Sequence, residues 1–199
     1  LPLIQRAIAH AGAPAGATLL DLFAGSGVVA RMAKALGFRV LANDWEPYAL
    51  EINRCYVGCN AAPEFGALGG YAAAIERLNA LPPRVDWVTR HLCPADDQRY
   101  DPAGDRLFYT RANGMIIDAM RAQIDEWEHA GLLAAGERAC LLAPMLYQAC
   151  YTANTSGVFK GFHNGWGGQT GTALYRILAR FALRPAVFCD NRAPNQVFR

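Results

Sequence analysis

The chain has 199 residues, of which 53% are hydrophobic and 18% charged, and its formal net charge at pH 7 is +2. This length and composition exclude a disordered chain and are typical of one folded domain with room for an inserted subdomain. The apolar runs are too short and too interrupted to span a bilayer, and the first residues show no signal-peptide pattern. We therefore expect a cytoplasmic protein with no membrane partner.

The predicted elements begin with a helix at residues 1–11. An apolar run that ends in Asp21-Leu22-Phe23 then predicts a buried parallel strand, and Gly25-Ser26-Gly27 lets the backbone turn tightly against a ligand. A short helix and a second strand at residues 38–42 follow, and Asp44 lies just beyond that strand. A glycine turn, a helix N-terminus and a carboxylate for ribose hydroxyls are typical of the nucleoside-binding half of a doubly wound sheet.

From residue 46 onward, helices alternate with irregular segments. The predicted helices lie at residues 46–59, 71–80, 111–130, 135–152 and 171–182. Residues 81–105 and 154–169 predict long loops, and short β-type runs return at 185–190 and 196–199. The sequence thus predicts an α/β fold with an incomplete, Rossmann-like sheet and a mostly helical insert. We divide it into a cofactor-binding half at 1–60, a helical insert at 61–183 and a return to the sheet at 184–199.

The glycine turn fits two classes of nucleotide-binding protein. Gly25-Ser26-Gly27-Val28-Val29-Ala30 satisfies the permissive dinucleotide pattern, so a nicotinamide-dependent oxidoreductase stays open as an alternative. A dinucleotide strand usually runs apolar into its first glycine, however, whereas Asp21 stands at this strand tip. The whole segment from Asp21 to Gly27 resembles the first motif of S-adenosylmethionine-dependent methyltransferases, especially those that modify DNA.

Two further segments carry a more specific resemblance. Residues 107–121 and 154–160 are similar to segments of the D12 class of N6-adenine-specific DNA methyltransferases, which is related to the Dam enzymes. The resemblance covers nearly the whole chain, and it implies a target-recognition insert placed after the cofactor motif. It also implies S-adenosyl-L-methionine as cofactor, double-stranded DNA as substrate and the N6 amine of adenine as target. Cytosine N4 is a near neighbour as target, and RNA or protein substrates stay open.

The resemblance assigns roles to residues around the glycine turn. Phe23 to Gly27 would contact the methionine part of the cofactor, Asp44 would hold the ribose hydroxyls and Trp45 would lie on the adenine. Asp21 would order the turn, with a capping role as the alternative, and plain core burial is the alternative for Trp45. The implied cofactor-binding residues are Asp21, Phe23, Ala24, Gly25, Gly27, Asp44 and Trp45.

The chain also departs from the family pattern. An amino-methyltransferase needs an Asp/Asn-Pro-Pro-aromatic segment to hold the target amine, whereas the one Pro-Pro pair here, Pro82-Pro83, lacks both flanking residue types. The family places this motif beyond Arg199 and a Gly-Lys motif before Leu1. We therefore assign no catalytic residue and expect a cofactor-plus-recognition fragment that is inactive alone. A non-catalytic nucleic-acid-binding fragment is the alternative.

Candidate DNA contacts lie in the insert, and basic residues outnumber acidic ones after residue 140. Arg111 and Lys160 suit phosphates, whereas asparagine and glutamine side chains suit base edges. Phe162 and Trp166 offer faces for stacking, or else they pin the glycine-rich loop to the helices. The implied DNA-binding residues are Arg111, Asn113, Lys160, His163, Asn164, Trp166 and Gln169.

The six cysteines form no pair of matched metal-binding motifs, so we expect no metal site. The resemblance admits a cognate restriction endonuclease as partner. The DNA recognition sequence and the oligomeric state stay open.

Overall fold

The computed structural model describes residues 2–14, 16–101, 103–134, 136–157 and 161–199. They form two compact units. Unit 1 comprises Leu1–Tyr71, Leu133–Ala143 and Pro185–Arg199, and unit 2 comprises Ala72–Leu132 and Pro144–Arg184. Compactness does not assign a function to either unit, so the division into cofactor-binding and recognition parts stays a prediction. Each unit is described by itself.

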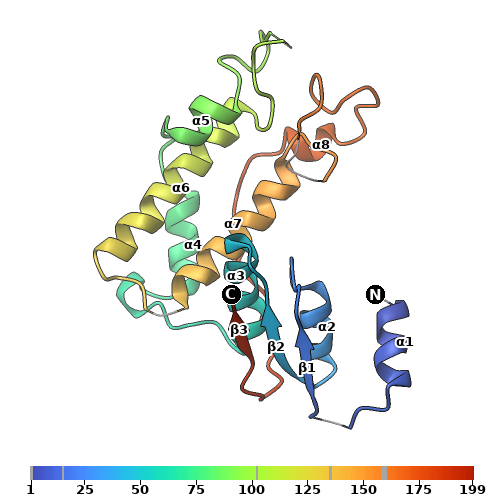
Figure 1. The fold of residues 1–199 in the computed structure, drawn as a ribbon. Helices are drawn as coiled ribbons and strands as arrows, with labels where there is room; N and C mark the ends of the chain where they lie inside the picture. The colour runs from blue at the N-terminus through green and yellow to red at the C-terminus, as the bar shows by residue number, and fades with distance from the viewer. Residues whose placement is uncertain (1, 15, 102, 135, 158–160) are drawn as a thin grey trace. The chain divides into compact units, whose positions relative to one another are not determined.

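Unit 1 contains a parallel sheet of three strands in the order β1-β2-β3 (Figure 1). The strands are β1 (Thr18–Asp21), β2 (Arg39–Asn43) and β3 (Gln196–Phe198). Asp21 is paired with Ala42 and Asn43 with Phe198, so the ends of all three strands meet at one edge of the sheet. Parallel strands need crossover connections, and helix α2 (Val28–Ala35) provides the one from β1 to β2.

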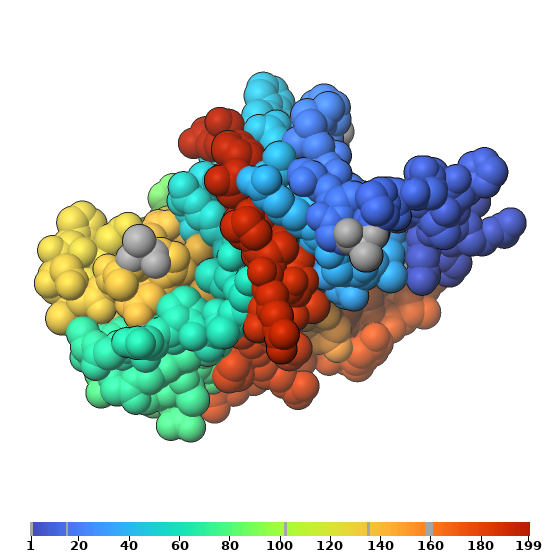
Figure 2. All heavy atoms as spheres, turned by 90° about the horizontal axis from the view of Figure 1, so that it is seen from below, coloured from blue at the N-terminus to red at the C-terminus, as the bar shows by residue number. Residues whose placement is uncertain are grey.

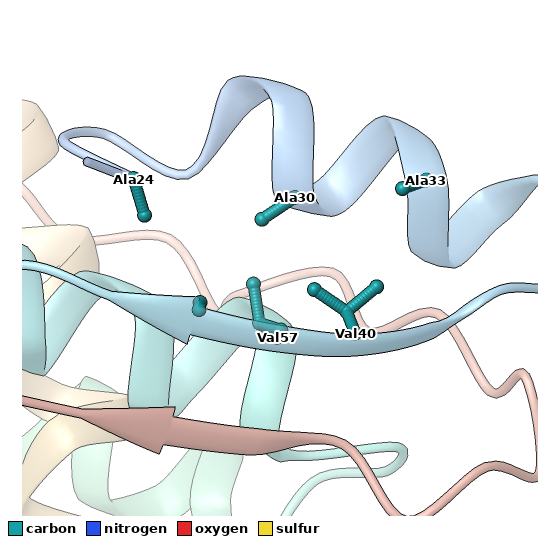
Figure 3. Close-up of a cluster of buried hydrophobic side chains, with 6 residues drawn as sticks. Ala24, Ala30, Ala33, Val40 and Val57 are labelled. Carbon is teal, nitrogen blue, oxygen red and sulfur yellow. The ribbon is translucent and has the colours of Figure 1, made fainter. Parts of the chain in front are cut away.

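Small side chains let α2 pack closely on the sheet. Ala30 and Ala33 are fully buried and point from α2 toward Val40 of β2 (Figure 3). Ala24, Ala42 and Val57 complete this cluster. Close packing fixes the N-terminus of α2 at the edge where β1 and β2 end, which is the position that a ligand of the glycine turn requires.

The second strand is followed by α3 (Pro47–Asn53), which passes directly into a π-helix, η1 (Arg54–Gly58). The sequence predicted one uniform helix here. Pro47 at the first helical turn agrees with that start. The wider π-helical turn is held at its end by Lys34 of α2, whose buried ammonium group donates to the carbonyl oxygens of Val57 and Cys59.

Other helical segments of unit 1 are α1 (Pro2–His10), a short 3-10 helix (Gly66–Leu68) and the first residues of α7 (Glu137–Thr152). None of the described residues of α1 is buried. Glu137 ties α7 to the rest of unit 1, because its carboxylate accepts hydrogen bonds from the backbone N–H groups of Phe65 and Ala134.

The predicted β-type run at 185–190 was wrong: these described residues form no strand. Figure 2 shows the C-terminal segment, in red, crossing the surface of unit 1. Its backbone is held by side chains instead of a strand ladder. Asn195 Oδ1 accepts a hydrogen bond from Val40 N at 2.9 Å, and Asn191 Nδ2 donates to Phe38 O at 2.6 Å. The ladder begins only at Gln196.

Unit 2 is helical in its described part and contains α6 (Arg111–His129), which agrees closely with prediction. Its other helices are α4 (Tyr71–Asn79, from Ala72 onward), α5 (Trp87–Leu92), the second part of α7 and α8 (Leu174–Ile177). No helix within the described ranges is long and apolar enough to cross a membrane.

Two secondary-structure predictions in unit 2 were wrong. Helix α5 lies inside the segment predicted as a loop, because Asp118 of α6 caps its first turn. The predicted helix at 171–182 is reduced to four residues. The amide of Asn113 forms hydrogen bonds with Ala179 O and Phe181 N, and the amide of Asn79 forms them with the carbonyl oxygen and the N–H of Leu183. These backbone groups are therefore not available to a longer helix.

Candidate functional site

The glycine turn joins β1 to α2 at the edge where the strands end. Gly25 and Gly27 have φ angles of 52° and 73°, in the left-handed region that favours glycine. Gly27 is the N-cap of α2, and its N–H donates to Ala24 O at 2.8 Å. Ala24 N in turn donates to Asn43 O at 3.0 Å, which attaches the turn to the end of β2.

Asp44 closes the turn from the end of β2. Its Oδ2 accepts a hydrogen bond from Gly25 N at 2.8 Å, and its Oδ1 accepts one from Glu46 N at 2.9 Å. These two backbone N–H groups, of Glu46 first and then Gly25, hold the pKa of the carboxyl below its ordinary value of 3.8. An ionised carboxylate has about four acceptor positions, so Asp44 keeps acceptor capacity beyond its bonds from Gly25 and Glu46.

Two aromatic side chains beside this polar turn are open to solvent. Phe23 is 88% exposed and Trp45 is 80% exposed. Core burial, the alternative for Trp45, is therefore wrong. Exposed aromatic faces that flank hydrogen-bonding groups are suited to a ligand with one flat ring and one polar part.

Asp21 differs from Asp44 in its electrostatic environment. Burial raises the pKa of its carboxyl above 3.8, and the backbone N–H groups of Phe23 and Ala30 oppose that rise. Ala30 lies in the first turn of α2, so the Asp21 carboxyl lies beside the start of that helix. Its Oδ2 is nonetheless buried and has no hydrogen-bond partner among the described residues.

Sequence reasoning missed Asn53, at the end of α3. It is 1% exposed, and its Nδ2 donates to Gly25 O at 3.1 Å and to Ala49 O at 2.8 Å. An asparagine on a predicted helix carries no recognisable signal, because its contact with the turn depends on how α3 packs.

The candidate DNA-binding residues lie in unit 2, except that Lys160 falls outside the described residues. Asn113 is 3% exposed, and its amide donates a hydrogen bond to Ala179 O and accepts one from Phe181 N. This arrangement leaves no free edge to read a base, so we remove Asn113 from the proposed set. Arg111 is half-buried, and its Nη1 donates to Pro94 O at 3.4 Å.

The described part of the glycine-rich loop is organised by Asn154, which is fully buried. Its Nδ2 donates to the carbonyl oxygens of His163 and Gly165, and its Oδ1 accepts from Gly167 N. Trp166 Nε1 donates to Asp97 O at 2.9 Å. These contacts leave Asn164 exposed at the surface of the loop.

Further contacts pin the aromatic residues of this loop. Phe162 packs edge-on against Phe108, with ring centroids 5.0 Å apart, and Trp166 packs edge-on against Tyr100. Both rings therefore hold the loop in place, as the structural alternative stated. His163 is half-buried and Gln169 is exposed, so both remain open to a ligand.

The described residues contain no group of three or more histidine, cysteine or acidic side chains placed to hold a metal ion. The glycine turn of unit 1 brings together backbone N–H groups, the Asp44 carboxylate and two exposed aromatic rings.

The chain is similar in sequence to known methyltransferases. The sequence profile of the family described as D12 class N6 adenine-specific DNA methyltransferase matches residues 1–169. The chain is 36% identical to the Type II methyltransferase M.NlaIII of Neisseria lactamica over 180 residues, 90% of this chain and 48% of that protein. It is 28% identical to the modification methylase LlaI of Lactococcus lactis subsp. lactis, over 91% of this chain and 28% of that protein.

The chain thus spans about half the length, or less, of these curated relatives. No solved structure matches it significantly. The profile match covers most of the sequence, including the glycine turn, Asp44 and the segment that begins α6. The chain belongs to the D12 class of N6 adenine-specific DNA methyltransferases.

Proposed function

We propose that this chain is the cofactor-binding and DNA-recognition part of an enzyme that methylates the N6 amine of adenine in double-stranded DNA. S-adenosyl-L-methionine would supply the methyl group as an electrophilic sulfonium carbon. The observation that carries this proposal is the closed turn in which Asp44 accepts from Gly25 N at the ends of β1 and β2. We propose that the three-stranded sheet belongs to a Rossmann-like methyltransferase fold.

The residues around the turn fit the adenosyl group. Asp44 retains acceptor positions for the two ribose hydroxyls, and the exposed ring of Trp45 is suited to stack on the adenine. Phe23, Ala24, Gly25 and Gly27 would contact the methionine part, which needs a close approach to backbone. Asp21 would keep the turn and the start of α2 in place.

The substrate side of the proposal concerns unit 2. Arg111 and Lys160 would contact phosphates, and His163, Asn164 and Gln169 would face base edges from the glycine-rich loop. Trp166 would support that loop. One of the two relatives is named as a modification methylase, so we also propose a cognate restriction endonuclease as partner, with both acting in the cytoplasm where the DNA lies.

The catalytic groups are not assigned. Residues 1–199 contain no Asp/Asn-Pro-Pro-aromatic segment to accept hydrogen bonds from a flipped adenine. We therefore propose that these residues alone bind cofactor without transferring its methyl group.

Calorimetric titration of the full-length protein with S-adenosylhomocysteine tests the cofactor site. Asp44→Ala should weaken binding by about 1–3 kcal/mol, the usual loss for hydrogen bonds to a charged group. Asp86→Ala, an acidic residue of unit 2, is the matched control and should bind as the parent does. Equal affinity of Asp44→Ala and the parent would remove Asp44 from the site, and binding of NADH in place of the adenosyl ligand would favour an oxidoreductase.

Transfer of labelled methyl from S-adenosylmethionine to DNA, followed by hydrolysis and separation of the bases, tests the target. We expect label on adenine with the full-length protein and none with residues 1–199 alone. Label on cytosine would shift the assignment to the N4 amine.

A further inference from the structure

Asn53 is linked to both glycines of the turn. Its Nδ2 donates to Gly25 O at 3.1 Å and also to Ala49 O at 2.8 Å, one turn back on α3. The first bond ties α3 to the turn, and the second fixes the orientation of the amide. A single buried side chain therefore joins the helix after β2 to the turn after β1.

The oxygen of the same amide faces Gly27. A Cβ atom at residue 27 would collide with Asn53 Oδ1, so the position of this oxygen requires a glycine at residue 27. Asn53 Oδ1 is buried and has no hydrogen-bond partner within the part of the chain that the structure describes. An unpaired buried oxygen is unfavourable, and its surroundings must hold it there against that cost.

The backbone around Asn53 is held from the other side. Asn53 ends α3 and is followed at once by the π-helix η1, and π-helical turns are frequent at functional sites. Lys34 of α2 fixes the end of η1 through Val57 O and Cys59 O. Helix α2, which starts at the glycine turn, thus holds the π-helix that directly follows Asn53, and Asn53 in turn holds the glycine turn.

We propose that Asn53 is a positioning residue of the cofactor site. It does not touch the ligand, since its side chain is buried, but it fixes Gly25 by a hydrogen bond and Gly27 by steric contact. The left-handed geometry of the turn then exists before the cofactor arrives, and binding does not have to order it. This inference rests on the proposed binding of S-adenosylmethionine.

Two measurements on the full-length protein test it. The first is amide hydrogen exchange of residues 22–30 without ligand, for the parent, Asn53→Ala and Asn79→Ala. The second is the affinity of each protein for S-adenosylhomocysteine. Asn79 is the matched control, because its amide also makes a two-point contact with backbone, at Leu183, but within unit 2.

Asn53→Ala should speed exchange in residues 22–30 by about tenfold or more and weaken the ligand by a similar factor. Asn79→Ala should change neither. Faster exchange with unchanged affinity would make Asn53 merely structural, and weaker binding with unchanged exchange would mean direct contact; either result overturns the proposal. If the parent binds no adenosyl ligand, the proposed function fails, whereas the exchange of residues 22–30 still decides whether Asn53 holds the turn.

A second variant pair tests the contact with Gly27. Gly27→Ala alone should speed exchange in the turn because the new Cβ meets Asn53 Oδ1. In the Asn53→Ala background the same change should have a clearly smaller effect, leaving only the strain of a positive φ. Fully additive effects would show that Asn53 does not act through Gly27.

Discussion

The ammonium group of Lys34 lies 2.6 Å from the carbonyl oxygen of Cys59, and the lysine residue is 1% exposed. It also donates to Val57 O at 2.9 Å, at the end of the π-helix that follows Asn53. A cation at the end of a helix offsets the partial negative charge of its last carbonyl groups. Burial lowers the pKa of Lys34 below its ordinary value of 10.5.

Lys34→Met should therefore destabilise the protein, because it leaves buried carbonyl oxygens without a donor. We expect the free energy of unfolding to fall by about 1–3 kcal/mol. Arg31→Met on the same helix is the control: Arg31 is exposed and lies over the Tyr56 ring at 4.2 Å, so its loss should cost less than about 1 kcal/mol. Urea unfolding of the full-length variants measures both, and equal costs would contradict the capping role of Lys34.

The two carboxylates of the turn should give opposite pH dependences. Hydrogen bonds from Glu46 N and Gly25 N lower the pKa of Asp44, so its contribution to stability is present above 3.8 and is lost as the pH falls through the lowered pKa. Burial raises the pKa of Asp21 in the folded state, so as the pH rises this carboxyl loses its proton at a lower pH in the unfolded state than in the folded state. Stability is then lost as the pH rises from 3.8 through the raised pKa.

Unfolding midpoints between about pH 3 and about pH 7 check these signs. In the Asp44→Asn variant, the loss of stability as the pH falls below 3.8 should be smaller than in the parent, because the carboxylate that is protonated there is absent. In the Asp21→Asn variant, the loss of stability as the pH rises above 3.8 should be smaller than in the parent. A steeper loss in Asp21→Asn than in the parent would show that its carboxylate is stabilised and not penalised by its surroundings.

The glycine turn and Asp44 could be predicted because they lie in one short stretch whose chemistry depends on local sequence. Helix α5 could not, since its capping carboxylate comes from Asp118, far along the chain in α6. Asn53 and Asn113 escaped correct assignment for the same reason: their amides pair with backbone that only tertiary packing brings near. The β-type run at 185–190 has suitable composition, but it lies outside the ladder that pairs β3 with β2.

The cap of α5 gives a third prediction. Asp118 accepts hydrogen bonds from the N–H groups of Asp86, Val88 and Thr89 and from Thr89 Oγ1 at 2.7 Å. Asp118→Ala leaves these donors unpaired and should destabilise the protein by at least about 2 kcal/mol.

Asp86 provides the comparison, because it occupies the N-cap position of α5 while its side chain makes no capping hydrogen bond to that helix. Asp86→Ala should cost at most about 1 kcal/mol, as expected for its exposed ion pair with Arg84. Chemical denaturation separates the two. A larger loss in Asp86→Ala would mean that position in sequence, rather than the remote carboxylate, caps this helix.

The last prediction distinguishes charge from loop geometry in the proposed DNA contact. Lys160→Ala in the full-length protein should weaken DNA binding and lower the log–log salt slope by about 1, since one phosphate contact is lost. Asn154→Ala should weaken binding while leaving that slope nearly unchanged. Its amide carries no charge, but it holds His163, Gly165 and Gly167 in the loop.

Arg77→Ala, which removes an exposed charge from α4, is the control for a general loss of positive charge and should change neither quantity. Binding isotherms at several salt concentrations give affinity and slope for all three variants. If Lys160→Ala leaves the slope unchanged, the lysine makes no phosphate contact. If Asn154→Ala binds as tightly as the parent, the geometry of residues 161–168 does not matter for DNA, and Arg111 and Gln169 become the places to look for the contact.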